Sequence, residues 1–179
     1  GSVSVADLAS TDVVVLNDIP FPQGAASDRL RGFVEGGGGL ACANDASPAI
    51  SGCTISNNNA RLGGGMYFVE DCNPVFSTCD ITSNTSDHGG GFYSLMRCDP
   101  TFTTCTISNN VVEYAGGAAA ANSYCDILFT DCSMTGNSAA WDTLSDGIDT
   151  AAAAAFTFAG SNTSNSMQAM GDAPFIFTA

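Results

Sequence analysis

The chain repeats one short phrase at a nearly constant interval. Residues 53–58 read CTISNN, and residues 105–110 read CTISNN again. Between them residues 79–84 read CDITSN, and residues 132–137 read CSMTGN. The four copies are therefore separated by 26, 26 and 27 residues. Self-similarity at a fixed period indicates a repeat architecture, in which each unit packs mainly against the units next to it.

Each unit predicts short strands joined by tight turns. Two stretches of alternating apolar and polar residues are separated by Gly, Pro, Asn and Asp, which is typical of strands rather than helices. The side that carries Cys53, Ile55 and Asn57 is small or apolar in the other copies too, so we expect it to face the core. Strands about 26 residues apart that stack in register are parallel. The sequence therefore predicts an all-β fold, a parallel β-solenoid.

Two further columns mark corners of the predicted coils. An asparagine closes every copy of the phrase, and it suits a turn with a left-handed backbone whose side-chain amides hydrogen-bond along the stack. Glycine triplets at 37–39, 63–65 and 89–91 predict a second tight corner, which is relaxed in the last unit to Ala115, Gly116 and Gly117. The asparagines are Asn58, Asn84, Asn110 and Asn137.

Eight cysteines fall two to a unit. We interpret them as one disulfide within each coil, and the alternative is a column of buried thiols, because cysteine is often buried without bonding. Bonding between coils is a third arrangement, but Cys42 stands four residues out of its column. The predicted pairs are Cys42 with Cys53, Cys72 with Cys79, Cys98 with Cys105, and Cys125 with Cys132.

The repeats resemble those of polymorphic outer-membrane proteins and of the wider group of right-handed parallel β-helices. GGL, GGM, GGF and GGA are each followed by ISNN, ITSN, ISNN or MTGN, over about residues 36–140. The resemblance implies a right-handed parallel β-helix of about five or six coils. Such repeats occur in surface adhesins, autotransporter passengers and secreted proteins, and the wider group includes polysaccharide lyases and hydrolases. The resemblance therefore implies a fold more strongly than a function.

We expect a single domain with three regions. Residues 1–35 do not repeat and predict an N-terminal cap, with a strand at 12–19 and a helical turn at 27–34. Residues 36–140 are the regular coils. Residues 141–179 predict irregular final coils and a C-terminal cap, with Phe156 and Phe158 in the Cys and Ile columns and a last strand at 173–179.

The charge of the chain limits its partners. It has no lysine, four arginines and a net charge of −14, so phosphate backbones and anionic membranes repel it and nucleic acid is not an expected partner. No apolar stretch reaches the length of a spanning helix, so we expect no direct membrane insertion. The cysteines favour a secreted, cell-surface or other oxidising extracytoplasmic location, with any targeting segment already removed.

Residues suited to catalysis or metal binding are sparse. His88 is the only histidine, and we interpret it as an exposed turn residue. Asp99 and Asp126 share one column and would lie about 5 Å apart, a spacing compatible with a retaining glycosidase. Other units carry Ser or Asn in that column. We therefore predict no catalytic site, no metal and no cofactor.

The first candidate binding surface is an array of hydroxyl groups. Outward-facing Thr and Ser in ranked Thr-x-Thr pairs resemble the faces of ice-binding proteins, although Thr and Ser are also ordinary outward strand residues. Asp80 and Asp131 interrupt the rows. The array consists of Thr54, Ser56, Thr82, Thr106, Ser108, Ser133 and Thr135, with Ser51, Ser77, Thr103 and Thr130 on the preceding strand.

The second candidate surface is apolar. If Met66 and Phe92 point inward, then Tyr67, Val69, Tyr93 and Leu95 point outward, and Ala119 and Ala121 continue the patch. Such a patch could contact a protein or sugar rings, and the alternative is that a terminal segment covers it. Nearby, Asp71 and Arg97 are expected to form an ion pair between coils.

The sequence thus favours a non-enzymatic extracellular module. It would bind a protein or glycan partner, or serve adhesion or assembly, through one flat solenoid face. Ice binding through the hydroxyl array is the alternative, and a carbohydrate-active enzyme is a distant third.

Overall fold

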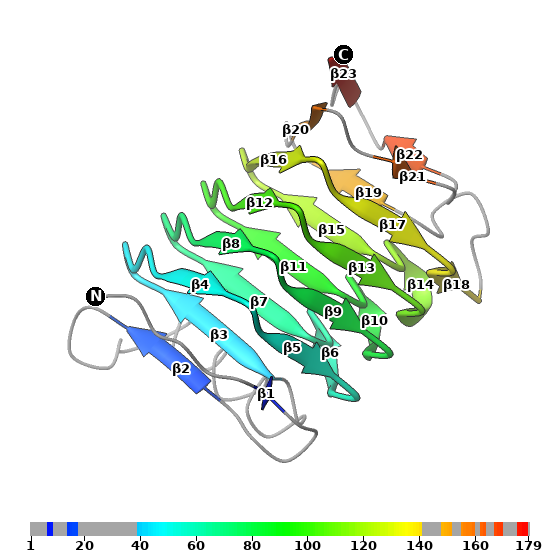
Figure 1. Ribbon diagram of the computed structural model, residues 1–179, viewed down its shortest axis with the longest axis horizontal. Coiled ribbons are helices and arrows are strands. Elements are labelled where there is room, and N and C mark those ends of the chain that lie inside the picture. The colour runs from blue at the N-terminus through cyan, green and yellow to red at the C-terminus, as the bar shows by residue number, and fades with distance from the viewer. Residues whose placement is uncertain are drawn as a thin grey trace.

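The structure, a computed structural model, describes residues 39–140 and a few strands outside that range. The outer strands are β1 (Asp7–Leu8), β2 (Val14–Asn17), β19 (Ile148–Ala151), β20 (Ala155–Ala159), β21 (Asn162–Thr163), β22 (Met167–Ala169) and β23 (Phe175–Thr178). Residues 39–140 form four stacked coils, each built from four short strands (Figure 1).

The strands recur in the same order in every coil. The first coil holds β3 (Leu40–Ala43), β4 (Ala49–Ser51), β5 (Thr54–Ser56) and β6 (Asn59–Leu62). The second holds β7 (Met66–Val69), β8 (Val75–Ser77), β9 (Asp80–Thr82) and β10 (Thr85–His88). The third holds β11 (Phe92–Leu95), β12 (Thr101–Thr103), β13 (Thr106–Ser108) and β14 (Val111–Ala115). The fourth holds β15 (Ala119–Asn122), β16 (Asp126–Thr130), β17 (Ser133–Thr135) and β18 (Ser138–Ala139).

Equivalent strands of successive coils pair in parallel and build four sheets. We name each sheet after its strand in the first coil. The β3 sheet has the order β2-β3-β7-β11-β15-β19-β22, and the β4 sheet has the order β4-β8-β12-β16-β20-β23. The β5 sheet has the order β1-β5-β9-β13-β17-β21, and the β6 sheet contains β6, β10, β14 and β18. The predicted all-β parallel solenoid with a repeat of about 26 residues is confirmed.

Columns of identical or similar side chains fill the interior. Phe76, Phe102 and Phe129 stack from coil to coil, with ring centroids 4.9 and 5.2 Å apart. Ile55 and its counterparts form a second buried column, as the alternation of the phrase predicts. Burying one such large side chain contributes about 1.5–3 kcal/mol, so the repeated columns are a main source of stability.

The corner after the phrase differs by one residue from the sequence prediction. The left-handed backbone lies at Asn57 (φ 58°) and its counterparts, and Asn57 is exposed rather than inward-facing. The following residue, Asn58, is buried at 1% exposure. A single left-handed residue reverses the alternation, which turns the next side chain into the core. The counterparts of Asn57 in this conformation are Ser83, Asn109 and Gly136.

The buried asparagines form a ladder through all four coils, as predicted. The Oδ1 atom of Asn110 accepts hydrogen bonds from the backbone N–H of Asn84 at 2.9 Å and from its Nδ2 at 3.0 Å. Asn84 accepts the same pair of bonds from Asn58, each at 3.0 Å. Asn137 accepts them from Asn110 at 3.1 and 2.9 Å. Amide side chains thereby satisfy buried backbone groups that no strand ladder reaches.

The glycine corner is confirmed, with a one-residue correction in the last coil. Gly63, Gly89 and Gly116 have positive φ and occupy the same place. Because Phe92 pairs with Ala119, the fourth triplet is 116–118 rather than 115–117. The shift arises in β14, where the register moves and the extra residue of the 27-residue step forms a bulge.

The ends of the chain agree in part with the prediction. β2 lies within the predicted strand at 12–19, and β23 lies within the predicted last strand. Phe156 and Phe158 pair with Ile127 and Phe129 of β16, so their placement in the Cys and Ile columns is wrong. The predicted helical turn at 27–34 lies outside the described residues, as does most of the predicted cap.

Candidate functional site

The predicted apolar surface is not an exposed surface. Tyr67 and Val69 are buried at 1% and 0% exposure, and Tyr93 and Leu95 are half-buried. At β3 and β7 the β3 sheet is covered on both sides, because all residues of these two strands are buried. This burial agrees with the alternative that another segment covers the patch. Alternation within a strand predicts the side on which a residue lies, but not whether that side is covered.

The register also corrects how the apolar patch continues. Tyr67 pairs with Tyr93, and their rings lie 6.1 Å apart between centroids. Tyr93 pairs with Ala120, so Ala120 lies on the side of the tyrosines. Ala119 and Ala121 pair with Phe92 and Ser94 on the inward side, so the predicted continuation through these two alanines is wrong.

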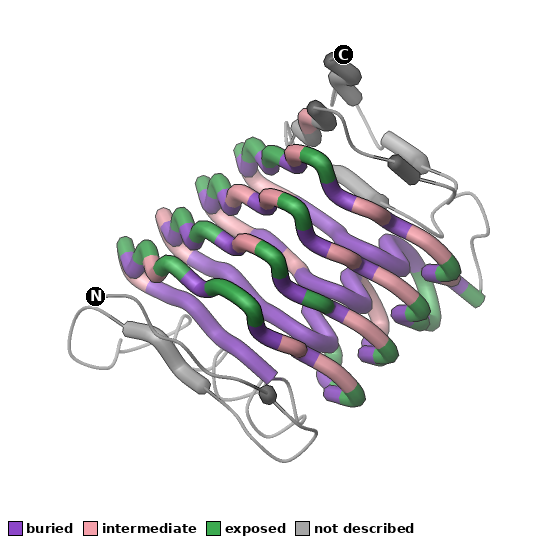
Figure 2. The backbone as a smooth tube through the Cα atoms, viewed as in Figure 1, coloured by how far each residue is buried: buried purple, intermediate pink, exposed green. Residues whose placement is uncertain are grey.

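The hydroxyl array is one continuous surface over the β4 and β5 sheets. On the β5 sheet one row contains Thr54, Asp80, Thr106 and Ser133, and the next contains Ser56, Thr82, Ser108 and Thr135. On the β4 sheet, Ser51, Ser77, Thr103 and Thr130 form a parallel row. The residues of the array are half-buried or exposed and alternate with buried residues along each strand, as the colours along the backbone show (Figure 2). The structure therefore brings together the residues of the predicted array.

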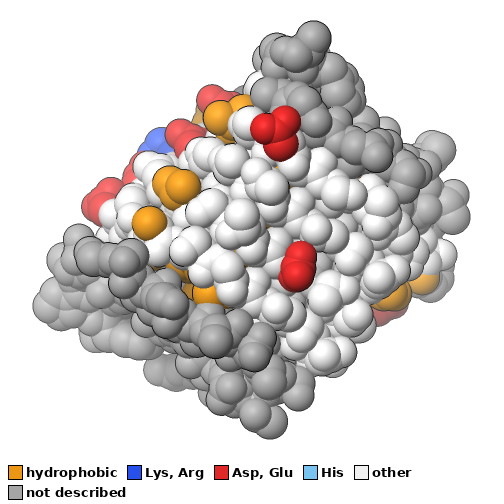
Figure 3. Space-filling view, in the orientation of Figure 1, with side chains coloured by type: hydrophobic (Ala, Val, Ile, Leu, Met, Phe, Trp, Pro, Cys, Tyr) orange, Lys and Arg blue, Asp and Glu red, His pale blue; other side chains and the backbone are white. Residues whose placement is uncertain are grey.

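The array carries little charge. The space-filling view onto this side of the molecule shows mostly side chains that are neither hydrophobic nor charged, with isolated acidic groups (Figure 3). Asp80 stands in a strand row, between Thr54 and Thr106. Asp131 instead lies at the corner between β16 and β17, with φ 51°, where the other coils have Gly52, Thr78 and Thr104. Only Asp80 of the two therefore interrupts a row of strand hydroxyls.

Neighbouring hydroxyl groups contact one another within the array. The Ser108 hydroxyl donates a hydrogen bond to Oγ1 of Thr82 at 3.2 Å. Sequence reasoning missed an outer row on the β4 sheet, where Val75 and Leu128 are 45% and 36% exposed and alternate with Ala49 and Thr101. The array is thus bordered by a strip of small and apolar side chains.

Charged residues gather at the corner between the β3 and β4 sheets. At this corner two successive residues of each coil have a left-handed backbone. Asp71 (φ 59°) is the second of the two in the second coil, and Arg97 (φ 58°) is the second of the two in the third coil. Arg97 donates from Nε and Nη2 to the two carboxylate oxygens of Asp71 at 2.8 and 2.6 Å. The hydrogen bonds from Arg97 lower the pKa of Asp71. The predicted ion pair is confirmed.

Asp99 has a structural task in the column that suggested a carboxylate pair. Its Oδ1 accepts a hydrogen bond from the backbone N–H of Asp126 at 2.8 Å. The N–H of Asp99 donates in turn to Oδ1 of Asn73 at 2.7 Å. Burial raises the pKa of Asp99, and this outweighs the lowering effect of the bond from Asp126. One oxygen of Asp99 is thus committed to joining two coils.

His88 is not the exposed turn residue that we expected. It is the last residue of β10, it is half-buried, and its ring stacks on Tyr114 with centroids 5.3 Å apart. Burial lowers its pKa, with opposing effects from Asp87, which raises it, and Arg61, which lowers it. Within residues 39–140, no three His, Cys, Asp or Glu side chains are arranged to hold a metal ion.

The cysteines form no disulfide in the described residues, so the predicted bonds within coils are not present. Cys72 and Cys79, for example, lie at opposite ends of β8. Three extended residues span about 10 Å, whereas disulfide-bonded Cα atoms lie within about 7 Å. The alternative of buried thiols is the one observed, and all eight are at most 2% exposed.

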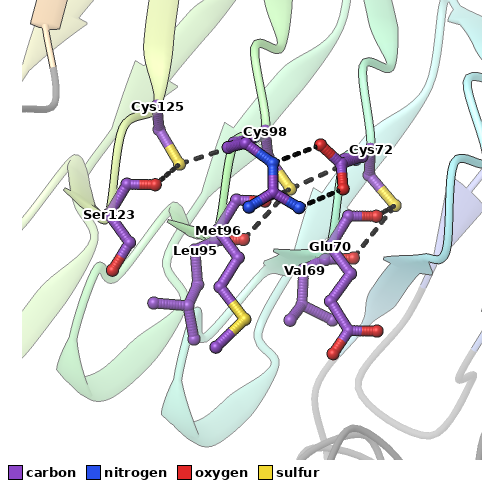
Figure 4. A network of polar contacts seen from close by, with 10 residues as sticks. Val69, Glu70, Cys72, Leu95, Met96, Cys98, Ser123 and Cys125 are labelled. Atoms are coloured by element: carbon purple, nitrogen blue, oxygen red, sulfur yellow. Dashed lines mark hydrogen bonds and ion pairs between the residues drawn. The ribbon is translucent and has the colours of Figure 1, made fainter.

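The thiols form two columns along the solenoid. The first contains Cys42, Cys72, Cys98 and Cys125, and the second contains Cys53, Cys79, Cys105 and Cys132. In the first column, the backbone N–H of Cys72 donates to Sγ of Cys98 at 3.3 Å, and Cys98 donates likewise to Cys125 at 3.3 Å. Figure 4 shows the sulfur atoms of Cys72, Cys98 and Cys125 on successive coils.

The second column repeats this arrangement. The backbone N–H of Cys79 donates to Sγ of Cys105 at 3.5 Å, and that of Cys105 donates to Cys132 at 3.4 Å. Hydrogen bonds with Cys132 and Cys79, and then burial, raise the pKa of Cys105. The hydrogen bond from Cys105 is also the main reason that the pKa of Cys79 falls to about 6. Backbone N–H groups thus link each cysteine to the sulfur of the next coil in both columns.

Comparison with known proteins identifies the fold. A family model described as "Right handed beta helix region" matches residues 29–166. No curated protein and no solved structure gives a significant match. In the part of the chain that the structure describes, no helix is long and apolar enough to cross a membrane.

Proposed function

We propose that this chain, which belongs to the right-handed β-helix family, is a non-enzymatic module that binds an extended surface through its hydroxyl array. The observation that carries the proposal is the register of the β5 sheet, which aligns Thr106 with Ser133 and Ser108 with Thr135 and continues through the other coils. We also propose that its repeats are of the polymorphic outer-membrane type, supported by their GG-apolar and apolar-x-x-Asn phrases.

The geometry of the array suits a regular, neutral partner. Neighbouring residues of one row lie on adjacent strands about 4.8 Å apart, and the two rows of the β5 sheet lie about 6.6 Å apart, because they hold alternate residues of each strand. The hydroxyls are held on short side chains over a packed core, so little conformational entropy is lost when a partner binds. A glycan or a protein surface with repeated hydrogen-bonding groups fits this lattice, and many weak contacts would add. Extracellular adhesion or assembly is the role that we propose.

The reading as an enzyme has less support. Asp99 is one of the two carboxylates in the column that suggested a glycosidase. It accepts a hydrogen bond from the backbone N–H of Asp126, and this bond joins two coils. The hydroxyl array itself contains no histidine, and the one histidine of the chain lies on the β6 sheet. These observations favour binding over catalysis.

The proposal is tested by a bulky substitution in the array. Thr106→Tyr places a large side chain among the rows, and we expect it to abolish binding on a glycan array or in a pull-down with extracellular proteins. Thr85→Tyr is the matched control, because Thr85 is an exposed strand residue in the neighbouring coil on the β6 sheet. Equal binding by both variants, or no wild-type binding to any neutral glycan or protein surface, would contradict the proposal.

Ice binding is the second candidate, favoured by threonines whose methyl and hydroxyl groups recur at strand spacing. Asp80 stands inside the row formed by Thr54 and Thr106, where a charge would disturb ordered water. We therefore expect wild-type thermal hysteresis to increase in Asp80→Thr and to disappear in Thr106→Tyr. Absence of hysteresis in the wild-type protein at high concentration would remove this candidate.

A further inference from the structure

The two cysteine columns contain more sulfur than packing requires. Aliphatic side chains would fill the same space, as Ile55 and its counterparts do beside the second column. In the first coil the repeat breaks, and Ala46 stands where later coils have Cys72 and Cys98. Cys42 of β3 takes over this place, because its Sγ lies 3.0 Å from the carbonyl oxygen of Ala46, the residue one coil before Cys72. The objection that Cys42 stands out of its column is thereby removed.

Successive sulfurs in a column are neighbours in space. The backbone N–H groups of Cys72, Cys98, Cys79 and Cys105 each donate to the sulfur of the next coil, at 3.3–3.5 Å. Equivalent residues of successive coils lie about 4.8 Å apart, which is inside the Cα separation of about 4.4–6.8 Å that disulfides allow. Cys42 is in register with Phe68 instead, so its bond to Cys72 depends on the place of its sulfur beside Ala46, one coil before Cys72. Bonds between coils are therefore sterically accessible, whereas bonds within a coil are not.

We propose that the two columns are oxidation sites, which form four disulfides between successive coils under oxidising conditions. All four thiols of a column can form disulfides with a neighbour only when the first bonds to the second and the third bonds to the fourth. The predicted bonds are Cys42–Cys72, Cys98–Cys125, Cys53–Cys79 and Cys105–Cys132. They would join the first coil to the second and the third to the fourth, and leave the middle interface without a covalent link.

The oxidant is a disulfide compound such as oxidised glutathione. One cysteine thiolate attacks it, which forms a mixed disulfide and releases one glutathione thiolate. The neighbouring cysteine thiolate then attacks the mixed disulfide, forms the bond between coils and releases the second glutathione. Each pair thus loses two protons and two electrons, and one oxidised glutathione becomes two reduced molecules. Because the thiols are at most 2% exposed, the exchange takes place during folding or local opening.

The bond would be easier to reduce than an ordinary structural disulfide. Disulfide-bonded Cβ atoms lie about 3.5–4.5 Å apart, somewhat closer than the strand spacing of about 4.8 Å, so two coils must move together by a few tenths of an ångström. Strain of this kind makes a disulfide more reducible. The columns would accordingly stabilise the solenoid reversibly.

The test is to map disulfides after refolding. The full chain is reduced, unfolded, refolded with oxidised and reduced glutathione, quenched in acid and digested with pepsin for mass spectrometry. Phe76, Phe102 and Phe129 lie between the two cysteines of their coils, so cleavage beside them separates the columns in the second, third and fourth coils. Cys42 and Cys53 stay on one peptide, and fragmentation between them assigns their partners. We expect a loss of two hydrogens per bond, the four predicted pairs, and a higher urea midpoint than for the reduced protein. Eight alkylatable thiols, or a pair such as Cys72–Cys79, would overturn the proposal.

A serine variant provides the control. In Cys125→Ser we expect one alkylatable thiol, at Cys98, while the other three bonds form as in the wild-type protein. Cys98→Ser should expose Cys125 in the same way. A bond from Cys98 to Cys105 in the first variant would overturn the assignment of columns. The wild-type map stands on its own if a variant does not fold.

Discussion

Replacing an interior asparagine of the ladder should cost far more stability than replacing the first one. In Asn110→Ala, the backbone N–H and the Nδ2 group of Asn84 lose the Oδ1 acceptor that they share at 2.9 and 3.0 Å. The carbonyl of Ile81 also loses its bond from Nδ2 of Asn110, at 3.1 Å. Nδ2 of Asn84 keeps its bond to the carbonyl of Ile55 at 3.0 Å, so of the two donors it is the backbone N–H that is left without a partner. A buried donor without a partner costs about 1–3 kcal/mol and a lost hydrogen bond about 1 kcal/mol, so the loss is about 2–4 kcal/mol.

Asn58→Ala is the matched control. Asn58 and Asn110 are the same residue type and are both buried, at 1% and 0% exposure, so the cost of the cavity is similar. The Oδ1 of Asn58 has no hydrogen-bond partner in the structure, so its removal strands no donor among the described residues. Among the described residues only the bond from its Nδ2 to Asn84 is lost, and Asn84 keeps the bond from the Asn58 backbone. The hydrogen-bond term should therefore be about 1 kcal/mol or less.

The measurement is urea unfolding followed by far-UV circular dichroism for both variants and the wild-type protein. Because repeat proteins can unfold in parts, the slopes of the transitions must agree before free energies are compared. We expect Asn110→Ala to be less stable than Asn58→Ala by about 1–3 kcal/mol. Equal destabilisation within about 0.5 kcal/mol would refute the reasoning, because the ladder would then not satisfy buried donors.

Two further predictions concern a corner and a charge. Gly65→Ala should lower the free energy of unfolding by about 3 kcal/mol, because a Cβ there would lie 2.6 Å from the carbonyl oxygen of Gly91. Gly52→Ala should lower it by about 1 kcal/mol, because a Cβ there meets open space and only the φ of +62° is unfavourable. Urea unfolding measures both values. The raised pKa of Asp99 means that its contribution to stability is present below its unfolded pKa and lost as pH rises through the folded pKa. Asp99→Asn should therefore be more stable at neutral pH by less than about 1 kcal/mol, and the difference should vanish in thermal melts near pH ~3. A constant difference at all pH values would contradict this reasoning.

The sequence was sufficient for the solenoid because each coil packs against near-copies of itself. The alternation that places Ile55 inward also places Ile81 inward at the same position of the next coil, so the two are predicted to be neighbours. The ladder of Asn58 and Asn84 followed for the same reason, since equal residues at equal places can bond only along the stack. Repetition thus converts a local pattern into a long-range contact.

The wrong predictions concern features of the structure that the repeat period does not determine. Asn57 was expected inside because alternation was counted through a corner, where a left-handed residue changes which side comes next. Tyr67 is buried at 1% exposure, and the alternation does not predict whether the outer side of a strand is covered. The cysteines within one coil are close in sequence, yet an extended strand separates them.

The candidate site was predictable as a set of residues but not as a surface. The outward direction of Thr106 and Ser108 follows from the phrase. The array is broad because it extends over two adjoining sheets. It carries little charge partly because Asp131 lies at a corner rather than in a strand row. The exposed strip with Val75 and Leu128 gave no signal, because apolar strand residues normally predict an inward face.

The bulge in β14 shows where the solenoid accepts added length. The third coil has one extra residue, and Glu113 and Tyr114 are consecutive exposed residues at that place. The neighbouring strands of the other three sheets keep their register, from Phe92 with Ala119 to Ser108 with Thr135. Insertions on the β6 side can therefore accumulate during evolution, or be introduced as tags and loops, while the lattice over the β4 and β5 sheets stays unchanged.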